Sequence, residues 1–342
     1  MAKWTEEELE VIKTNFGVKP IRAWANLLPG RSLDAIHKKG QRIGLYSDIK
    51  YGDYPAPRYE PDLPKATDLT FTELWEAALN FQRMSQELGT SLDPVDIYLD
   101  VDRPIGLGFI ADIHIGSINT PLDQVRARFE MMREQTWLYL VSAGDTIDNF
   151  LPTRHGQGMF GTMFPPELQK ELVLDLYMRM EGRWLALVQG CHEDFSHDAD
   201  DFDFTKYLSS AVGAANLGFG GQINLHVGEQ LYQIAVRHKY RYNSSFNFTH
   251  TCKRLREREY PSADIVCVAH HHQATIEQMP HPDKDRIYIR PGSMKGPDRY
   301  ARSLGFKDTG SQIPTVILWP DKRKMLSFLN LEDAVEVFKG WY

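Results

Sequence analysis

Five strand-length apolar runs that end in side chains able to bind metal ions constrain the fold of this chain more than any other feature. The runs alternate with loops or helical segments, which is typical of layered α/β folds, and the later runs lie close together, as in a sandwich of mixed sheets. The side chains that follow the runs are Asp112 and His114, Asp145 and Asp148, Cys191 and His192, His238, and the consecutive His270, His271 and His272. Because the carboxyl ends of neighbouring strands meet at one edge of a sheet, we expect these side chains to converge.

Each of these motifs alone has an ordinary structural explanation. An Asp-x-His sequence after a strand is more often a hydrogen-bonded turn than a ligand pair, and a lone buried histidine usually has its hydrogen bonds satisfied within the core. A Gly-Asp-x-x-Asp sequence is also compatible with a turn, and we interpret His155, His197 and His250 as bystanders. The recurrence of metal-binding residue types after five successive runs favours one shared site.

The order of the motifs resembles the signature of the calcineurin-like metallophosphoesterase superfamily, from about residue 104 to about residue 320. That signature runs Asp-x-His, Gly-Asp-x-x-Asp, Gly-Asn-His-Glu, His and Gly-His-x-His. The resemblance implies a four-layer α/β/β/α sandwich with a site for two metal ions at the strand ends. It places one ion on Asp112, His114, Asp145 and His272, and the second on Asp145, Cys191, His238 and His270.

The residue types explain the chemistry that this resemblance implies. Imidazole and carboxylate ligands suit manganese, iron or zinc, and a bridging carboxylate can hold two such ions. A hydroxide between the ions would attack phosphorus in line, while both cations offset the charge that develops on the phosphoryl oxygens. His192 carries no metal in the family pattern, so we assign it to protonate the leaving oxygen, and Asp148 to orient its imidazole through a hydrogen bond.

Three positions depart from the family pattern. Cys191 stands where the family has asparagine, which favours a softer ion such as zinc if the thiol ionises and weakens the second site if it does not. Ala269 replaces the glycine of Gly-His-x-His, which is a mild change if the backbone there is ordinary. Lys239 follows His238 where many members have glycine, which adds positive charge near the phosphate.

Residues 1–47 read as a separate, all-α trihelical domain. A Thr5/Glu8 capping box predicts the start of the first helix, and apolar residues then recur at helical spacing. The inward residues of the three predicted helices are Leu9, Ile12 and Phe16, then Ile21, Trp24 and Leu28, then Leu33, Ile36 and Ile43. The segment resembles Myb-like and homeodomain-like helix-turn-helix modules, which implies DNA binding through Arg31, Lys38, Gln41 and Arg42.

A proline-rich linker is expected over residues 48–69, which hold four prolines and no periodic pattern. The catalytic domain then occupies residues 70–342. It opens with an amphipathic helix from Thr70 to Leu88, which we expect to pack on the catalytic domain or to form a dimer contact.

Composition limits the classes of protein open to the chain. Its 342 residues carry a net charge of −7, but residues 1–50 sum to +3, so the basic head and the acidic remainder need separate explanations. Three widely spaced cysteines argue against a disulfide framework. The chain start has no signal-peptide pattern, and no apolar run approaches the roughly 20 residues of a membrane span. We therefore expect a cytoplasmic protein, in the bacterial host cytoplasm if a phage encodes it.

The predicted substrate is DNA. Beyond His238, basic residues alternate with aromatic ones, and Lys239 and Arg241 are the predicted phosphate contacts. A solvated amphipathic helix is an equally good interpretation of the later part of this stretch. The chain resembles phosphoesterases of tailed bacteriophages and DNA-repair exonucleases, which favours a DNA-directed phosphodiesterase or nuclease. A phosphomonoesterase or small-molecule phosphodiesterase with a protein-binding head, and a DNA-binding regulator with a degraded catalytic domain, remain open.

Overall fold

The computed structural model describes residues 3–16, 18–19, 21–45, 70–88, 94–151, 158–282, 284–298, 302–303, 305 and 310–340. The chain divides into two compact units, Met1–Gln82 and Arg83–Tyr342. The division falls within the helix Phe71–Leu88, whereas the predicted start of the catalytic domain is residue 70. The predicted linker, residues 48–69, lies outside the described residues.

The described part of the first unit contains a small helical domain. Helix α1 (Glu6–Asn15) begins at the predicted capping box, in which Glu8 N donates to Thr5 and Thr5 N donates to Glu8. Helix α2 (Leu33–Arg42) begins at Ser32, whose hydroxyl accepts from Ala35 N. The domain is all-α, as expected, and its core consists of Ile12, Phe16, Trp24, Leu28 and Ile36.

The middle helix of this domain differs from the prediction. It consists of two 3-10 turns, η1 (Ile21–Ala23) and η2 (Ala25–Leu27), and not of one α-helix. Trp24 separates the turns because its ring is drawn into the core, where its indole N–H donates to the carbonyl of Lys19. Leu33 was predicted to face the core but is 40% exposed.

Helix α3 (Phe71–Leu88) begins at the predicted Thr70/Glu73 capping box. Its apolar side chains are largely exposed, with Phe71 at 78%, Trp75 at 58% and Phe81 at 72%. The expectation that this helix packs on the catalytic domain or on a second copy of the chain stays a prediction.

The second unit is built on two six-stranded sheets. The first sheet has the order β1-β6-β7-β8-β10-β9, with β1 (Val95–Leu99), β6 (Gly220–Val227), β7 (Gln230–Arg237), β8 (Ile265–Val268), β9 (Thr275–Met279) and β10 (Arg286–Arg290). The second has the order β12-β11-β2-β3-β4-β5, with β2 (Ile105–Ile110), β3 (Leu138–Ser142), β4 (Trp184–Leu187), β5 (Ala215–Asn216), β11 (Thr315–Leu318) and β12 (Met325–Phe328). Parallel pairs β2/β3, β3/β4 and β7/β8 bring the predicted site segments to common sheet edges.

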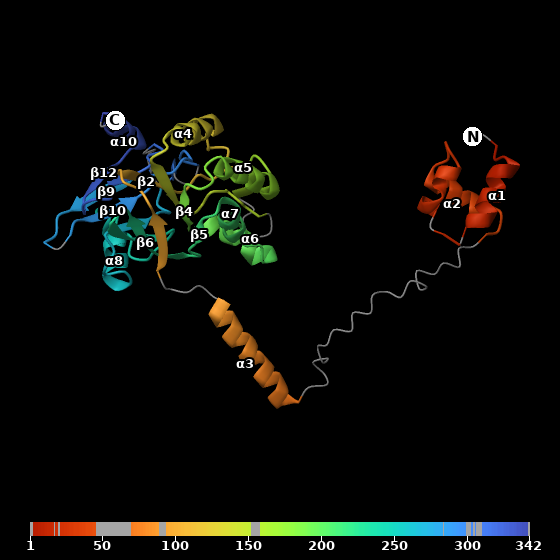
Figure 1. Cartoon of the computed structure of the whole chain (residues 1–342), viewed down its shortest axis with the longest axis horizontal. Helices are drawn as coiled ribbons and strands as arrows, with labels where there is room; N and C mark the ends of the chain where they lie inside the picture. The colour runs from red at the N-terminus through yellow and green to blue at the C-terminus, as the bar shows by residue number, and fades with distance from the viewer. Residues whose placement is uncertain are drawn as a thin grey trace. The chain divides into compact units, whose positions relative to one another are not determined.

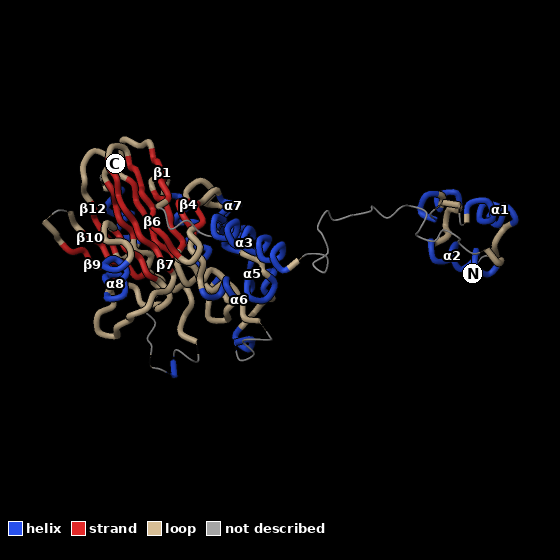
Figure 2. The backbone as a smooth tube through the Cα atoms, turned by 90° about the horizontal axis from the view of Figure 1, so that it is seen from below, coloured by secondary structure: helices blue, strands red, loops and turns tan. Residues whose placement is uncertain are grey.

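Helices cover the outer face of each sheet, as Figures 1 and 2 show. Apolar side chains of both sheets form the central core between them. The outer face of the second sheet is covered by α4 (Leu122–Glu134), α5 (Pro166–Met178), α7 (Phe204–Val212) and α10 (Leu331–Lys339). Helix α8 (His250–Arg258) packs on the first sheet through Cys252 and Leu255. The predicted four-layer α/β/β/α sandwich is therefore confirmed.

Two simpler expectations concern the described residues as well. Cys191, Cys252 and Cys267 are all free, so none of the cysteines is in a disulfide. Among the described helices, none is both long and apolar enough to cross a membrane.

Candidate metal centre

The five predicted strand-end segments converge on one site. Strands β2, β3 and β4 of one sheet and β7 and β8 of the other end beside each other, and four overlapping three-residue groups of metal-binding side chains form there. Two of the groups contain Asp145, and one of these also contains His192. We call Asp112, His114 and His272 the first triad, and Cys191, His238 and His270 the second triad. Within each triad, the candidate ligand atoms lie within 4.8 Å of one another.

The first triad joins the loop after β2 to the loop after β8. His114 Nε2 lies 3.2 Å from His272 Nε2, and Asp112 Oδ1 lies 3.2 Å from the same nitrogen. His114 and Asp112 are buried, whereas the side chain of His272 is 38% exposed. The triad is thus anchored inside the protein and opens toward solvent through His272.

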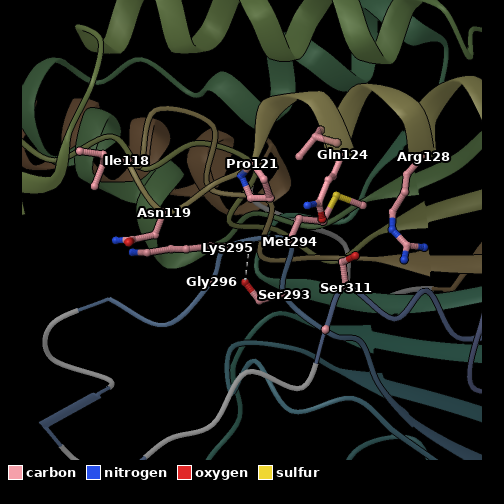
Figure 3. A pocket seen from close by; sticks show the side chains of 12 residues that line it. Ile118, Asn119, Pro121, Gln124, Arg128, Ser293, Met294, Lys295, Gly296 and Ser311 are labelled. Carbon is pink, nitrogen blue, oxygen red and sulfur yellow. Dashed lines mark hydrogen bonds between the residues drawn. The ribbon is translucent and has the colours of Figure 1, made fainter.

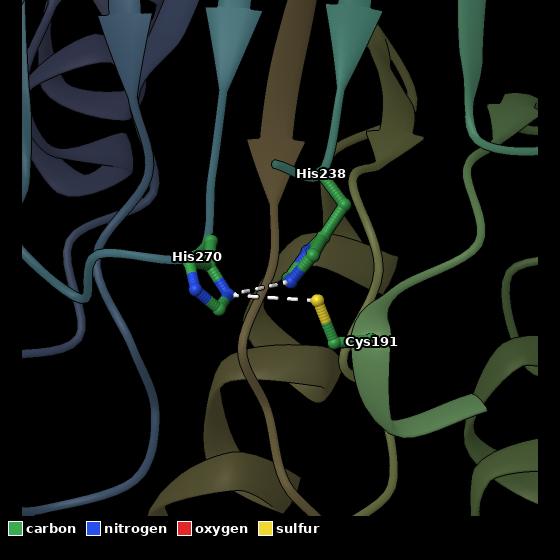
Figure 4. A group of neighbouring side chains, drawn as sticks. All are labelled: Cys191, His238 and His270. Carbon is green, nitrogen blue, oxygen red and sulfur yellow. Dashed lines mark hydrogen bonds between the residues drawn. The ribbon is translucent and has the colours of Figure 1, made fainter. Parts of the chain in front are cut away.

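The second triad combines two imidazoles with a thiol, and Figure 4 shows the three side chains pointing toward one another. His238 Nε2 lies 3.2 Å from His270 Nδ1, which lies 3.8 Å from Cys191 Sγ. His238 Nδ1 donates to the carbonyl of Ala143 at 2.8 Å. This hydrogen bond fixes the tautomer and directs Nε2 toward the other two ligands.

Asp145 lies between the triads. Its Oδ2 is 3.0 Å from His238 Nε2 and 3.9 Å from His114 Nε2, so a single carboxylate oxygen faces both groups. Its Oδ1 accepts from the backbone N–H of His192 at 2.9 Å. Asp145 is therefore the side chain that a shared, bridging ligand would require.

The donor set fits divalent metal ions. Two ligands about 2.1 Å from one ion, at angles between 90° and tetrahedral, lie about 3.0 to 3.4 Å apart, which matches the closest distances in both triads. In each triad two imidazole nitrogens face each other at 3.2 Å. Asp112 Oδ1 is buried, and it lies 3.2 Å from His272 Nε2. A metal ion could accept lone pairs from all of these nitrogen and oxygen atoms at once. A proton can be shared by only two of them.

The protonation states of the two triads follow the same pattern. Burial holds the pKa of His114 well below its usual value, and burial with the charge of His238 lowers the pKa of His270 to about 4. Burial also opposes protonation of His238 and His272, but neighbouring carboxylates, Asp145 and Asp112, prevail and raise the pKa of each. Each triad therefore has one neutral imidazole and one paired with a carboxylate.

The backbone at the donors is unusual. Positive φ angles occur at Asp112 (53°), His114 (53°), Asp145 (54°), His270 (73°) and His272 (56°). Left-handed backbone is uncommon for residues other than glycine, and it clusters where side chains must be aimed at a functional site. The tight turns after β2, β3 and β8 aim these side chains at one point.

Two glycines allow the loops after β3 and β4 to touch. A Cβ added at Gly144 would lie 2.6 Å from Gly190 Cα, and one added at Gly190 would lie 2.1 Å from Asp145 N. Glu193, to which no role was predicted, joins these loops: its buried carboxylate accepts from the backbone N–H groups of Asp145, Thr146 and Gly190. Burial, with the charge of Asp145, raises the pKa of Glu193.

The predicted partnership of His192 and Asp148 needs a correction. His192 Nδ1 lies 2.5 Å from the main-chain carbonyl of Asp148, and not against its carboxylate. The carboxylate turns instead toward His114 Nδ1, at 3.5 Å, and Lys295 Nζ, at 3.4 Å. The turn after β3 explains the difference, because it aims the carbonyl and the side chain of Asp148 in different directions. Since a carbonyl only accepts, His192 Nδ1 carries a proton and Nε2 is the nitrogen left for substrate.

The loop after β10 supplies site residues that the sequence analysis did not identify individually. Lys295, whose side chain is 7% exposed, pairs with Asp148 and Asp298. Ser293 donates to the carbonyl of Asp112 at 2.8 Å. Figure 3 shows Lys295 at the edge of a cavity of about 290 Å³, together with Asn119 and Ser311. Burial raises the pKa of Asp148 although Lys295 opposes this rise.

The predicted DNA contacts in the helical domain differ in their surroundings. Arg31 donates to both carboxylate oxygens of Glu8, at 2.9 and 2.8 Å, and its guanidinium lies 4.2 Å from the centre of the Trp4 ring. Arg31 therefore ties α1 to the turn before α2, which a DNA contact would have to break. Lys38, Gln41 and Arg42 are exposed on α2, and Lys38 pairs with Asp34 at 2.8 Å.

The predicted phosphate contacts lie beside the second triad. Lys239 and Arg241 are exposed and line a cleft of about 650 Å³ that also contains Cys191 and His238. Lys239 follows His238, which comes directly after strand β7. The structure thus brings both basic residues to the edge of the candidate site.

Comparison with known proteins leaves the family undecided. No family model and no curated protein matches the chain. Solved structures that match include zinc-bound Vps29 from Entamoeba histolytica, with 11% identity and a TM-score of 0.35 over 66% of this chain and 97% of that one. A predicted phosphoesterase from Streptococcus pneumoniae has 15% identity and a TM-score of 0.29 over 66% and 98%. A metallophosphoesterase from Sphaerobacter thermophilus has 15% identity and a TM-score of 0.33 over 69% and 94%. The fold assignment therefore rests on the two sheets and their helices.

Proposed function

We propose that this protein is a metal-dependent phosphoesterase that uses two divalent ions, manganese, iron or zinc, one at each triad. The observation that carries the proposal is the position of Asp145, with one oxygen 3.0 Å from a nitrogen of the second triad and 3.9 Å from a nitrogen of the first. Divalent ions bound there would act as Lewis acids on a phosphoryl group.

The chain's own residues divide the remaining work. Asp145 aligns the two triads, and Glu193 holds Asp145 in place through the backbone of the same loop. His192 donates from Nδ1 to the carbonyl of Asp148, so the imidazolium form of His192 would give its Nε2 proton to the leaving oxygen and become a neutral imidazole. Lys295 lies beside Asp148 and offsets its negative charge at the edge of the site.

The finer proposal concerns the substrate, which we infer to be DNA. Lys239 and Arg241 line the cleft beside the second triad, where they can contact a phosphodiester backbone. Lys38, Gln41 and Arg42 form an exposed basic face on α2 that is compatible with a DNA groove. Arg31 is left out of this face because it is paired with Glu8.

The test is hydrolysis of bis-p-nitrophenyl phosphate and of labelled single- and double-stranded DNA, with manganese or zinc added, by the wild type and His192→Ala. We expect cleavage of both kinds of substrate by the wild type and a loss of about 10²-fold or more in His192→Ala. His197→Ala is the matched control, because this exposed histidine lies on the same helix, α6 (Cys191–Asp200). Cleavage of the small ester alone would refute DNA as the substrate. Absence of any hydrolysis would refute the proposed phosphoesterase activity.

A further inference from the structure

We propose that the cleft beside the second triad binds an unpaired nucleobase, stacked on Phe219, so that the substrate is single-stranded rather than paired nucleic acid. We call this cleft, lined by Gln189, Phe195, Phe219, Lys239, Tyr240 and Arg241 among others, the Phe219 cleft. The inference rests on the proposed phosphoesterase function and specifies which substrate that site accepts.

Backbone contacts hold Phe219 in a defined place. Leu217 N donates to the carbonyl of Leu187 at 2.9 Å, and Gln189 N donates to the carbonyl of Gly218 at 2.7 Å. These bonds fasten the turn before β6 to the end of β4, just ahead of Cys191. The turn cannot slide along β4 without losing both bonds.

Strand pairing fixes the other side of the turn. Gly220 pairs with Arg237, so the same register sets Phe219 level with His238 of the second triad. A Cβ added at Gly220, where φ is +139°, would lie 2.3 Å from Arg237 Cγ. Glycine therefore allows the turn to press against β7, and Phe219 lines the same cleft as Cys191 and His238.

The ring is exposed although it has this rigid support. Phe219 is 58% exposed, so its ring is accessible to a ligand in the cleft. The cleft has a volume of about 650 Å³, within the usual range for small-molecule sites. Phe195 and Tyr240 add further aromatic surface to it.

The polar residues of the cleft favour a nucleotide over a purely apolar ligand. Lys239 and Arg241 supply positive charge beside the second triad, where the phosphate would lie. Gln189 and Asp194, whose side chains are hydrogen-bonded at 3.0 Å, supply groups that can meet the edge of a base. Aromatic rings beside a basic groove are the usual means of binding unpaired bases, because every base offers a face for stacking. Bases in a duplex are already stacked on their neighbours and cannot offer that face.

The experiment uses two chromogenic esters with the same leaving group: thymidine 5′-(p-nitrophenyl phosphate) and methyl p-nitrophenyl phosphate. The ratio of the kcat/KM values for the two esters isolates the contribution of the nucleoside to catalytic efficiency. We expect the wild type to prefer the thymidine ester, and Phe219→Ala to reduce that preference by about 5- to 150-fold, the range that stacking of one base on an aromatic ring provides. Phe219→Tyr should retain it. Hydrolysis of the methyl ester should be the same in all of these proteins.

Tyr98→Ala is the matched control, because Tyr98 is another exposed aromatic side chain (71%) and pairs with His226 on the same sheet, far along β6 from Phe219. A second readout is fluorescence anisotropy of labelled oligothymidylate and of a duplex with the metal-free protein, where Phe219→Ala should weaken only the single-stranded complex. Equal losses on both esters in Phe219→Ala, or a wild type without preference for the thymidine ester, would overturn the inference and leave the phosphoesterase intact. Failure of the wild type on both esters would instead refute the proposed function.

Discussion

The two triads differ in how their donors are held and in one donor atom. All three donors of the first triad have left-handed backbone, whereas in the second only His270 does. Cys191 begins helix α6 and His238 directly follows β7, so regular secondary structure holds two of the three donors of the second triad. The first triad combines a carboxylate with imidazoles, and the second combines a thiol with imidazoles.

For the proposed two-ion centre, the difference predicts two unlike metal sites that share Asp145. Carboxylate and imidazole ligands suit manganese and iron, whereas a thiolate favours zinc. We therefore expect the second triad to select the softer ion.

The largest expected effect comes from removing what the triads share. Asp145→Ala should lower the hydrolysis of bis-p-nitrophenyl phosphate by more than about 10³-fold, because it disturbs both ions and not one donor alone. Asp102→Ala, at an aspartate whose side chain is 94% exposed, is the control and should keep full activity. If Asp145→Ala had activity near that of the wild type, Asp145 would not be a shared ligand of two ions.

Removing one donor from each triad separates the two sites. His272→Ala and Cys191→Ala should each lose one ion per chain, measured by native mass spectrometry, and about 10²-fold in activity. Each variant should keep the ion of the other triad, because their ligands other than Asp145 are distinct. Loss of both ions in either variant would mean that the triads act as one cooperative site.

Changing only the donor atom at position 191 should have a smaller effect. Cys191→Asn replaces sulfur by an amide oxygen and should lower the affinity for zinc relative to manganese by roughly tenfold. In cobalt-loaded protein the thiolate-to-metal absorption should disappear in Cys191→Asn and persist in Cys252→Ala, since Cys252 is buried between α8 and the first sheet and belongs to neither triad. Persistence in Cys191→Asn would show that the thiol is not a ligand.

The smallest expected effect lies outside both triads, at the ion pair of the helical domain. The Arg31 guanidinium, with the backbone of Thr5, lowers the pKa of Glu8 from 4.5 to about 2. The pair therefore stabilises the domain above pH 4.5, and this contribution is lost as the pH falls toward 2. Arg31→Ala should reduce the acid dependence of hydrogen exchange protection in α1, relative to α5, and leave ester hydrolysis unchanged. Lys38→Ala is the control, because Lys38 pairs with Asp34 elsewhere on α2.

Much of the site could be predicted because strand ends are local signals whose meeting place follows from sheet topology. The four imidazoles and one carboxylate of the triads, together with Asp145, lie after the strand-like runs, as the sequence predicted. The orientation of Asp148 could not be predicted, since it depends on the φ and ψ angles of one tight turn. Glu193 and Lys295 act through contacts between loops that are distant in the sequence, which no local pattern reveals.

The helical domain shows the same limit. Its core residues and caps follow from helical spacing, and most were predicted correctly. The inward turn of Arg31 and the break at Trp24 arise from packing within the folded domain, so residue type alone did not indicate them.

The left-handed backbone of the donors has a consequence for how far this protein can be stabilised. Strained residues each cost about 1 kcal/mol or more unless surrounding structure or a ligand compensates for them. We expect Asp112→Gly or His114→Gly to relieve that strain and to raise the melting temperature of the metal-free chain, while removing a donor of the first triad. A search for heat-resistant variants without a test for activity would therefore select proteins that have lost their ligands, and the most durable form of this fold would be an inactive one.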